Sequence, residues 1–289
     1  ALPDLANYIS EFTQLMKSYN QDAVYYAHAG AGEIHLRPIL NLKTEEGNQQ
    51  FREISLASAK LVKKYRGSLS GEHGDGRVRA SFLEFMVGEK NYELLKSIKK
   101  TWDKNAVFNA GKIINAKPID TDLRYEIDRT EPEIETILDF SETGGILNLA
   151  EKCNGSGDCR KLAASGGTMC PSYMATKDEK TTTRARANVL REFLTNPKSK
   201  NRFNQPEIKE ALDLCLSCKG CKSECPSNVD MAAMKAEFLY QYQKENGVSF
   251  RTKMFAETQK NNELASKLPR IANFFLSAPI TSTIAKKIM

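Results

Sequence analysis

Several features that assign a chain to a familiar class are missing from these 289 residues. No run of about 18 apolar residues occurs, so the sequence predicts no membrane-spanning helix. The opening residues, Ala-Leu-Pro-Asp, lack the basic start and apolar stretch of a secretory signal. No glycine-rich phosphate-binding loop of the dinucleotide or P-loop type is present. We therefore expect a cytoplasmic protein whose dinucleotide-binding part, if it has one, lies outside this chain.

Cysteine and histidine are scarce and confined to short segments. All seven cysteines lie between Cys153 and Cys225, and the three histidines all lie within the first 73 residues. An odd, clustered set of cysteines argues against a disulfide framework and favours metal ligation in a reducing compartment. The net charge of +6 is concentrated at the end of the chain, where residues 247–289 carry seven Lys and Arg against two Glu. The remainder is nearly neutral, which argues against a nucleic-acid-binding surface.

The most informative stretch is residues 215–226, which read C-L-S-C-K-G-C-K-S-E-C-P. The spacing C-x2-C-x2-C-x3-C-P is typical of bacterial ferredoxins, in which three thiolates converge on one iron–sulfur cluster and the fourth serves another. Zinc also accepts four thiolates, but its motifs commonly supply two close pairs separated by a longer loop. The spacing therefore predicts an iron–sulfur protein that transfers electrons, with a zinc site as the alternative.

Residues 1–125 have the pattern of an α+β domain. Apolar residues at three- and four-residue steps predict helices over residues 4–19, 45–66 and 89–103, and Gly67 is expected to end the second of them. Residues 23–27 and 34–40 read as short strands joined by a glycine-rich turn. This order predicts an antiparallel sheet with helices on one face.

The rest of the chain is predicted to be helical. Residues 126–140 are charged and contain Pro132, so we interpret them as a linker. Cysteine loops alternate with predicted helices over residues 183–194 and 231–242, which defines an all-α domain at 141–245. Residues 246–289 form a basic tail with apolar residues such as Phe274 and Ile280. Two interpretations of the tail stay open, peripheral contact with the inner face of a membrane or packing against another part of a longer protein.

The histidines occupy two polar, glycine-rich turns. His28 and His35 flank the turn between the predicted strands, and His73 follows Glu72 in G-E-H-G-D-G-R. Imidazoles and a carboxylate that meet from two such turns suit a divalent transition metal. Hydrogen-bonded structural histidines are the alternative, and spacing alone does not remove it.

The stretches G-S-L-S-G-E-H-G-D-G-R-V-R from Gly67 and W-D-K-N-A-V-F-N-A-G-K-I from Trp102 resemble the substrate-side domain of FAD-linked D-2-hydroxyacid dehydrogenases. That family includes D-lactate and D-2-hydroxyglutarate dehydrogenases and the flavin subunit of glycolate oxidase. Its H-x-G-D-G-N-x-H turn is similar to residues 28–35, with Ala31 in place of Asp and Glu33 in place of Asn. The two differences leave the identity of the substrate open.

This resemblance implies roles for individual residues. His28, His35 and Glu72 would bind a zinc-like or manganese-like ion that holds the substrate oxygens, and His73 would be the general base that takes the hydroxyl proton. Three arginines are candidates to hold a second substrate carboxylate, or are solvated surface cations: Arg37, Arg77 and Arg79. The family's N-P-G-K segment, which runs close to the flavin, is matched by Asn109, Gly111 and Lys112, with Ala110 in place of the proline.

The cysteine loops resemble the two-cluster α-helical ferredoxin domain of succinate dehydrogenase iron–sulfur subunits. Crossed pairing would give one four-iron cluster a ligand set of Cys215, Cys218, Cys221 and Cys170. Three thiolates then remain for a second cluster: Cys153, Cys159 and Cys225. Ser156 occupies the place of the missing fourth thiolate, and its oxygen is a poorer ligand for such a cluster. One cluster is therefore expected, and the second stays open.

The segments C-N-G-S-G-D-C-R-K and M-C-P-S-Y-M-A-T also resemble the fused form of the dehydrogenase family, in which flavin and ferredoxin domains share one polypeptide. We thus interpret the chain as an internal fragment of an enzyme that oxidises a D-2-hydroxyacid, transfers hydride to FAD and relays electrons through iron–sulfur. Without the FAD-binding domain, the fragment is expected to be inactive. Two alternatives are a stand-alone electron-transfer subunit that docks on a flavoprotein and a zinc-stabilised interaction module. The electron acceptor and the oligomeric state are not predicted.

Overall fold

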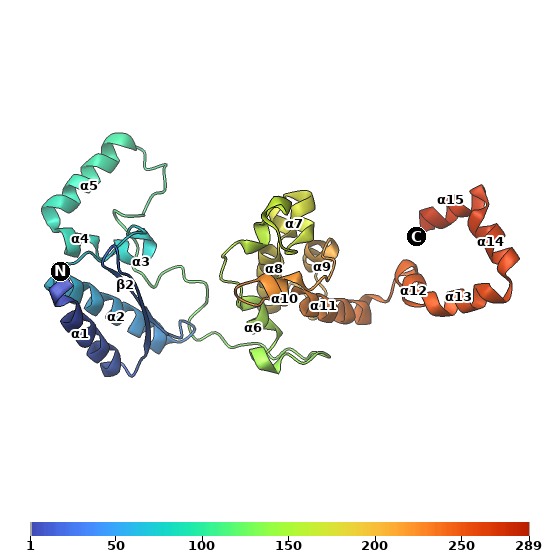
Figure 1. Ribbon diagram of the computed structural model, residues 1–289, viewed down its shortest axis with the longest axis horizontal. Helices are drawn as coiled ribbons and strands as arrows, with labels where there is room; N and C mark the ends of the chain where they lie inside the picture. The colour runs from blue at the N-terminus through green and yellow to red at the C-terminus, as the bar shows by residue number, and fades with distance from the viewer. Residues whose placement is uncertain (1, 289) are drawn as a thin grey trace. The chain divides into compact units, whose positions relative to one another are not determined.

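The computed structural model describes residues 2–288, and the side chains of residues 3–284 (Figure 1). It divides into two compact units, residues 1–130 and 131–289, which we describe separately. The division falls inside the segment that we interpreted as a linker. The C-terminal part of this segment contacts the second unit. There the Glu237 carboxylate accepts hydrogen bonds from the backbone N–H groups of Ile137 and Leu138. The exact domain limits stay a prediction.

The first unit is α+β, as predicted. Its expected helices and strands are all present, and two short helices between residues 76 and 87 were not expected. The elements are α1 (Leu5–Ser18), β1 (Ala23–His28), β2 (Glu33–Pro38), α2 (Glu45–Lys64), α3 (Gly76–Ala80), α4 (Leu83–Val87) and α5 (Glu89–Trp102).

A small core joins the sheet to two helices. β1 and β2 form an antiparallel hairpin, and Ala23 and Leu36 on one of its faces pack against α1 and α2. The buried residues of this core are Phe12, Met16 and Ile54. Because burial of apolar area is the main stabilising term, a core of this size gives the unit limited stability.

The boundaries of α2 follow local sequence signals. The Thr44 side chain accepts a hydrogen bond from the Gly47 N–H and caps the first turn. At the other end Arg66, not Gly67, has the left-handed backbone conformation, with φ 56°. The Gly67 N–H donates to the Val62 carbonyl at 2.9 Å, as the second residue past the helix does in a Schellman ending. The helix thus ends at Lys64, two residues before the end that we expected, and Gly67 belongs to its ending.

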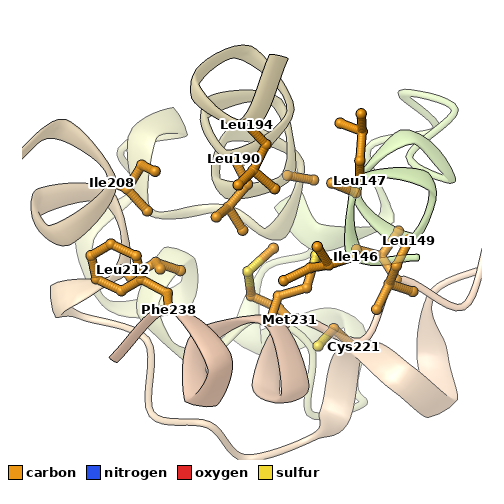
Figure 2. Packing of buried hydrophobic residues seen from close by; sticks show 14 of the residues in the cluster. Ile146, Leu147, Leu149, Leu190, Leu194, Ile208, Leu212, Cys221, Met231 and Phe238 are labelled. Carbon is orange, nitrogen blue, oxygen red and sulfur yellow. The ribbon is translucent and has the colours of Figure 1, made fainter. Parts of the chain in front are cut away.

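Over its described residues, the second unit contains helices and no strands, as expected. Its helices of five or more residues before the tail are α6 (Ile146–Glu151), α7 (Pro171–Thr176), α8 (Thr183–Thr195), α9 (Pro206–Asp213), α10 (Gly220–Glu224) and α11 (Met231–Asn246). Side chains from α6, α8, α9 and α11 converge on one apolar cluster, with Cys221 beside Met231 (Figure 2). The second unit therefore has a much larger core than the first, and cysteines belong to it.

Four further helices follow the core of the second unit: α12 (Phe250–Ala256), α13 (Thr258–Lys267), α14 (Pro269–Ser277) and α15 (Pro279–Ile288). Several large apolar side chains on them are exposed, among them Phe274 at 66% and Leu276 at 69%. Among the described residues, no helix combines the length and apolar character needed to cross a bilayer.

Candidate functional site

The β1–β2 hairpin carries two of the three histidines on one face. In its register Tyr26 pairs with His35, and His28 pairs with Glu33. Because side chains alternate along a strand, these four residues and Arg37 share one face. The opposite face packs against α1 and α2. The sheet thus gathers polar side chains away from the core of the first unit.

Glu72 brings the second glycine-rich turn to the histidines. Its Oε1 atom lies 3.4 Å from His28 Nε2, 3.4 Å from His35 Nε2 and 3.2 Å from His73 Nε2. Candidate ligand atoms of His28, His35 and Glu72 all lie within 4.8 Å of one another. Two ligands bound about 2.1 Å from one ion at a tetrahedral angle lie about 3.4 Å apart. The spacing therefore suits ligands that share a divalent cation.

His35 is the most enclosed of the three imidazoles. Its side chain is 23% exposed, compared with 51% for His28 and 74% for His73. The His35 Nε2 atom is buried and has no hydrogen-bond partner in the described part of the chain. A buried polar atom without a partner is costly, and ligation of a cation would satisfy it. The residues predicted as metal ligands therefore fit a metal ion.

A stack of side chains fixes the orientation of the His35 ring. The Tyr26 ring lies parallel to it, with centroids 4.4 Å apart and an interplanar angle of 10°. The Arg37 guanidinium carbon lies 5.0 Å from the centroid of the Tyr26 ring. Our sequence reasoning missed Tyr26. Strand alternation was the available signal, because Tyr26 lies two residues before His28 on the same face.

A cavity of about 1020 Å³ adjoins the histidines in the first unit. Its lining includes His35, Glu72, His73, Arg37 and Arg79, together with apolar residues of α1 and α2. The guanidinium of Arg79 donates to the Gly74 carbonyl at 2.7 Å, and its Nε atom is buried without a partner among the described residues. A concave, partly apolar space with a few convergent cations suits a small anionic ligand.

Arg77 differs from the other two candidate arginines. It is not among the residues that line the cavity. Its guanidinium donates to the Thr121 carbonyl and lies 3.4 Å from Asp122 Oδ2. The structure therefore brings Arg37 and Arg79 to the cavity and places Arg77 in a local ion pair.

The segment that carries Asn109, Gly111 and Lys112 is held in place by one carboxylate. Asp103 accepts hydrogen bonds from the backbone N–H groups of Val107 and Phe108, both at 2.9 Å, and from Lys99 Nζ at 2.7 Å. The Lys99 ammonium, followed by the two N–H groups, holds the pKa of Asp103 below its ordinary range. Asn109 and Gly111 both have positive φ, at 49° and 68°. The loop is thus ordered by side-chain contacts that follow α5.

In the second unit, four cysteines surround one small cavity. Its lining includes Cys170, Cys215, Cys218 and Cys221, the set that crossed pairing predicts for one cluster. Ser217 and Lys219 have left-handed backbone conformations, with φ 52° and 64°. The backbone therefore changes direction at Ser217, between Cys215 and Cys218, and again at Lys219, between Cys218 and Cys221. The donor set, four cysteines that line one space, matches the four thiolate ligands of a four-iron cluster.

Two contacts join the cysteine run to the loop before Cys170. Glu224 accepts hydrogen bonds from the backbone N–H groups of Thr168 at 2.6 Å and Met169 at 3.1 Å. These bonds hold the pKa of the Glu224 carboxyl below its ordinary range. Gly220 approaches the same loop so closely that a Cβ atom there would lie 3.3 Å from Thr168 Cβ. Our sequence reasoning missed Glu224, although it stands between Cys221 and Cys225.

The remaining three cysteines are only partly brought together. Arg184 interacts electrostatically with both Cys153 and Cys159. Cys225 packs against the core of the second unit, and its N–H donates to the Cys221 carbonyl. Ser156 is exposed on the loop between Cys153 and Cys159. A second ligand set stays a prediction.

Burial keeps the enclosed thiols protonated in the absence of a metal. Burial raises the pKa of the Cys221 thiol to about 11 and also raises the pKa of Cys159. Because iron and zinc bind the thiolate, loading of these sites releases protons.

Comparisons with known protein families match both units. Residues 1–113 match the family of FAD linked oxidases, C-terminal domain, and residues 152–230 match the 4Fe-4S dicluster domain. The second match agrees with iron–sulfur ligation rather than with zinc.

Individual relatives match nearly the whole chain. A D-2-hydroxyglutarate dehydrogenase from Haemophilus influenzae is 30% identical over 98% of this chain, and one from Escherichia coli is 27% identical over 98%. These matches cover 30% and 31% of those two proteins. A D-lactate dehydrogenase from Archaeoglobus fulgidus is 33% identical over 38% of this chain and 24% of its own length.

The chain spans about 30% of the length of the two dehydrogenases that it matches over most of its residues. No solved structure matches it. The matched segments coincide with the histidine turns in the first unit and the cysteine loops in the second. The chain therefore combines the C-terminal domain of an FAD-linked oxidase with a 4Fe-4S dicluster domain.

Proposed function

We propose that this chain supplies the substrate-side residues and the electron relay of an FAD-dependent enzyme that oxidises a D-2-hydroxyacid of the D-lactate or D-2-hydroxyglutarate type. One observation carries the proposal: three imidazole nitrogens lie within 3.4 Å of a single Glu72 oxygen on the face of the hairpin turned away from the core. The names of the relatives support the substrate class, because they are D-2-hydroxyglutarate and D-lactate dehydrogenases.

His28, His35 and Glu72 would hold a divalent ion of the zinc or manganese type. Two neutral imidazoles and a carboxylate suit either metal, and the unpartnered His35 Nε2 atom supports ligation. When bound, such an ion lowers the pKa of a coordinated hydroxyl and orients the substrate oxygens.

His73 would accept the hydroxyl proton. Its imidazole is 74% exposed beside Glu72 and lines the adjoining cavity, so the ring can reach a ligand there. An imidazole has an ordinary pKa close to neutral pH, which suits a general base. In the complete protein, His73→Asn should lower kcat by about 10²–10⁴-fold. The metal content should stay unchanged, and retention of full activity would remove His73 from this role.

Arg37 and Arg79 would hold a second substrate carboxylate, where the substrate has one, by charge-assisted hydrogen bonds. Both line the cavity, whereas Arg77 pairs with Asp122. Arg79→Gln should therefore raise KM more than Arg77→Gln does in the complete protein.

Asn109, Gly111 and Lys112 would lie close to the flavin, which supplies the hydride acceptor when bound. Their loop is held by Asp103, so its backbone is positioned before any ligand binds. We expect no turnover when the chain alone is mixed with D-lactate or D-2-hydroxyglutarate and a dye acceptor. Turnover in that mixture would contradict the proposal that the flavin-binding part of the enzyme lies outside this chain.

Cys170, Cys215, Cys218 and Cys221 would hold a four-iron cluster, and Cys153, Cys159 and Cys225 a second, three-thiolate cluster. The test is anaerobic reconstitution of the chain followed by measurement of iron and acid-labile sulfide. Stoichiometric zinc without sulfide would favour an interaction module. If the second ligand set is one thiolate short, Ser156→Cys should raise the iron content and Ser156→Ala should not.

The metal site in the first unit is tested separately. Calorimetric titration of the chain with Mn²⁺ or Zn²⁺, after its cysteines have been loaded with iron and sulfide, should detect one site, and Glu72→Gln should weaken it by at least about tenfold. Glu93→Gln is a matched control, because Glu93 is an exposed glutamate whose nearest ion-pair partner is Lys96.

The basic tail, residues 247–289, would bind a partner surface. Its exposed apolar side chains and surplus of lysine and arginine support contact with an anionic membrane or with another region of protein. Co-sedimentation with vesicles that contain anionic lipid distinguishes these, because only the first predicts salt-sensitive binding to lipid alone.

A further inference from the structure

Arg186 is the largest side chain that is almost fully enclosed among the described residues, at 1% exposure. It lies on α8, and its Nε atom donates to the Ala211 carbonyl at 2.8 Å. Its Nη1 atom lies 3.4 Å from Cys170 Sγ, and its Nη2 atom is buried with no hydrogen-bond partner in the described part of the chain. Arg186 also lines the small cavity that Cys215, Cys218 and Cys221 surround. A buried guanidinium thus faces the Cys170 sulfur and lines the cavity shared by the four cysteines.

We propose that Arg186 is a positioning residue that raises the reduction potential of the cluster held by Cys170, Cys215, Cys218 and Cys221. The proposal rests on the proposed function, because it requires that these four cysteines bind a cluster. It adds a residue that is neither a ligand nor a part of the cysteine motifs.

The direction of the effect follows from charge. A four-iron cluster with four thiolates is anionic and gains one more negative charge on reduction, and its potential depends on net charge and on hydrogen bonds to its sulfurs. A guanidinium stays protonated at any relevant pH. Because Arg186 is enclosed in the protein interior, its charge is weakly screened. It therefore stabilises the reduced cluster more than the oxidised one.

The hydrogen bonds around Cys170 agree with this role. The Cys170 thiol donates to the Thr181 carbonyl at 3.6 Å and faces Arg186 Nη1 on another side. A thiolate ligand has no proton to donate, so Arg186 would then be the hydrogen-bond donor that faces this sulfur. Lys235, a partly buried cation that also lies near the run, donates to the carbonyls of Leu212 at 2.8 Å and Cys215 at 2.5 Å. Lys235 thus contacts backbone, whereas Arg186 contacts sulfur.

The experiment compares variants of the 289-residue chain, reconstituted anaerobically. The reduction potential is measured by a redox titration monitored by electron paramagnetic resonance. The signal of the relevant cluster is identified as the one that disappears in Cys218→Ala, which lacks one of its four proposed ligands. Arg186→Gln should make reduction about tenfold less favourable, a shift of about 59 mV to lower potential for one electron. Arg186→Lys, which keeps the charge, should shift it less. Arg202→Gln is the matched control, because Arg202 also donates to backbone carbonyls, those of Leu194 and Thr195.

A purely structural Arg186 would alter stability and leave the potential of the assembled cluster unchanged, and that result would overturn the proposal. If the Arg186 variants hold no cluster, the wild-type chain labelled with ¹⁵N-arginine decides. Pulsed electron paramagnetic resonance should then detect nitrogen coupled to the reduced cluster, and its absence would also overturn the proposal. A wild-type chain that binds no iron and sulfide at all would instead defeat the proposed function itself.

Discussion

The first unit holds two of its three candidate metal ligands at exposed positions, whereas the second holds two of the four candidate ligands of its four-iron cluster in a buried core. His28 and Glu72 are 51% and 41% exposed, and their unit buries a core of three residues. Cys170 and Cys221 are 7% and 8% exposed and belong to a core of twenty buried residues. An ion at the histidines can therefore exchange with solvent while the fold persists. A cluster at the cysteines is continuous with the packing that stabilises its unit.

The largest difference between the two units is expected when one ligand is removed from each site. Cys221→Ala should remove the iron and sulfide of the four-iron cluster and destabilise the second unit, because binding and folding are coupled for an enclosed metal site. His35→Asn should abolish binding of a divalent ion and leave the fold of the first unit intact. Metal analysis and denaturant unfolding followed by circular dichroism measure both effects. Equal stability of the Cys221→Ala and wild-type chains after reconstitution would contradict the coupling.

The two cores can be compared directly with a phenylalanine in each. Phe12 and Phe238 are both almost fully buried, and replacement by Ala at such sites costs about 3–5 kcal/mol. The same loss should unfold the first unit, whose core is small, and leave the larger second unit folded. Hydrogen exchange measured separately over residues 2–130 and 131–249 distinguishes the two responses. Loss of protection in both units after either substitution would show that they do not unfold independently.

A smaller effect is expected where the two cysteine loops meet. Gly166 and Gly167 both have positive φ, at 72° and 80°, so Ala at either position should cost about 1–2 kcal/mol. Only at Gly167 would the added Cβ meet another side chain, because it would lie 2.5 Å from Glu224 Oε2. Gly167→Ala should therefore destabilise the chain more than Gly166→Ala and speed the loss of iron to a chelator. Equal rates for the two variants would mean that the Glu224 contact does not hold the loops together.

The candidate ligands of both sites could be predicted from the sequence, whereas the residues from distant parts of the chain that contact those ligands or their loops could not. Strand alternation and the turn residues placed His28 and His35 together, and cysteine spacing identified the set around the small cavity. Both patterns are short and local. Glu224 and Arg186 carried no such signal, because their partners lie 16 to 56 residues away and only the packing of helices brings them together. The left-handed conformation of Arg66 was missed because the helix was expected to extend through that residue, and a non-glycine residue rarely adopts it.

The smallest predicted effect concerns acid and the loop that carries Asn109, Gly111 and Lys112. Since the folded-state pKa of Asp103 is lowered, its contribution to stability is present above the ordinary Asp value of 3.8 and is lost as the pH falls through the lower folded-state pKa. The backbone N–H groups of Val107 and Phe108, which donate to the Asp103 carboxylate, report the change through their NMR chemical shifts. Between about pH 5 and about pH 2, these chemical shifts should move toward disordered-chain values in the wild-type chain.

Two variants test whether Asp103 causes that shift. Asp103→Asn cannot pair with the Lys99 ammonium as a carboxylate does, so its Val107 and Phe108 amide chemical shifts at neutral pH should resemble those of the acidified wild type. Glu93→Gln removes an exposed ion pair on the same helix and should keep the wild-type profile. If Asp103→Asn still titrates like the wild type, the carboxylate does not hold this loop. The loop would then need its flavin partner to become ordered, and the contrast between an open first site and a preorganised second one would widen.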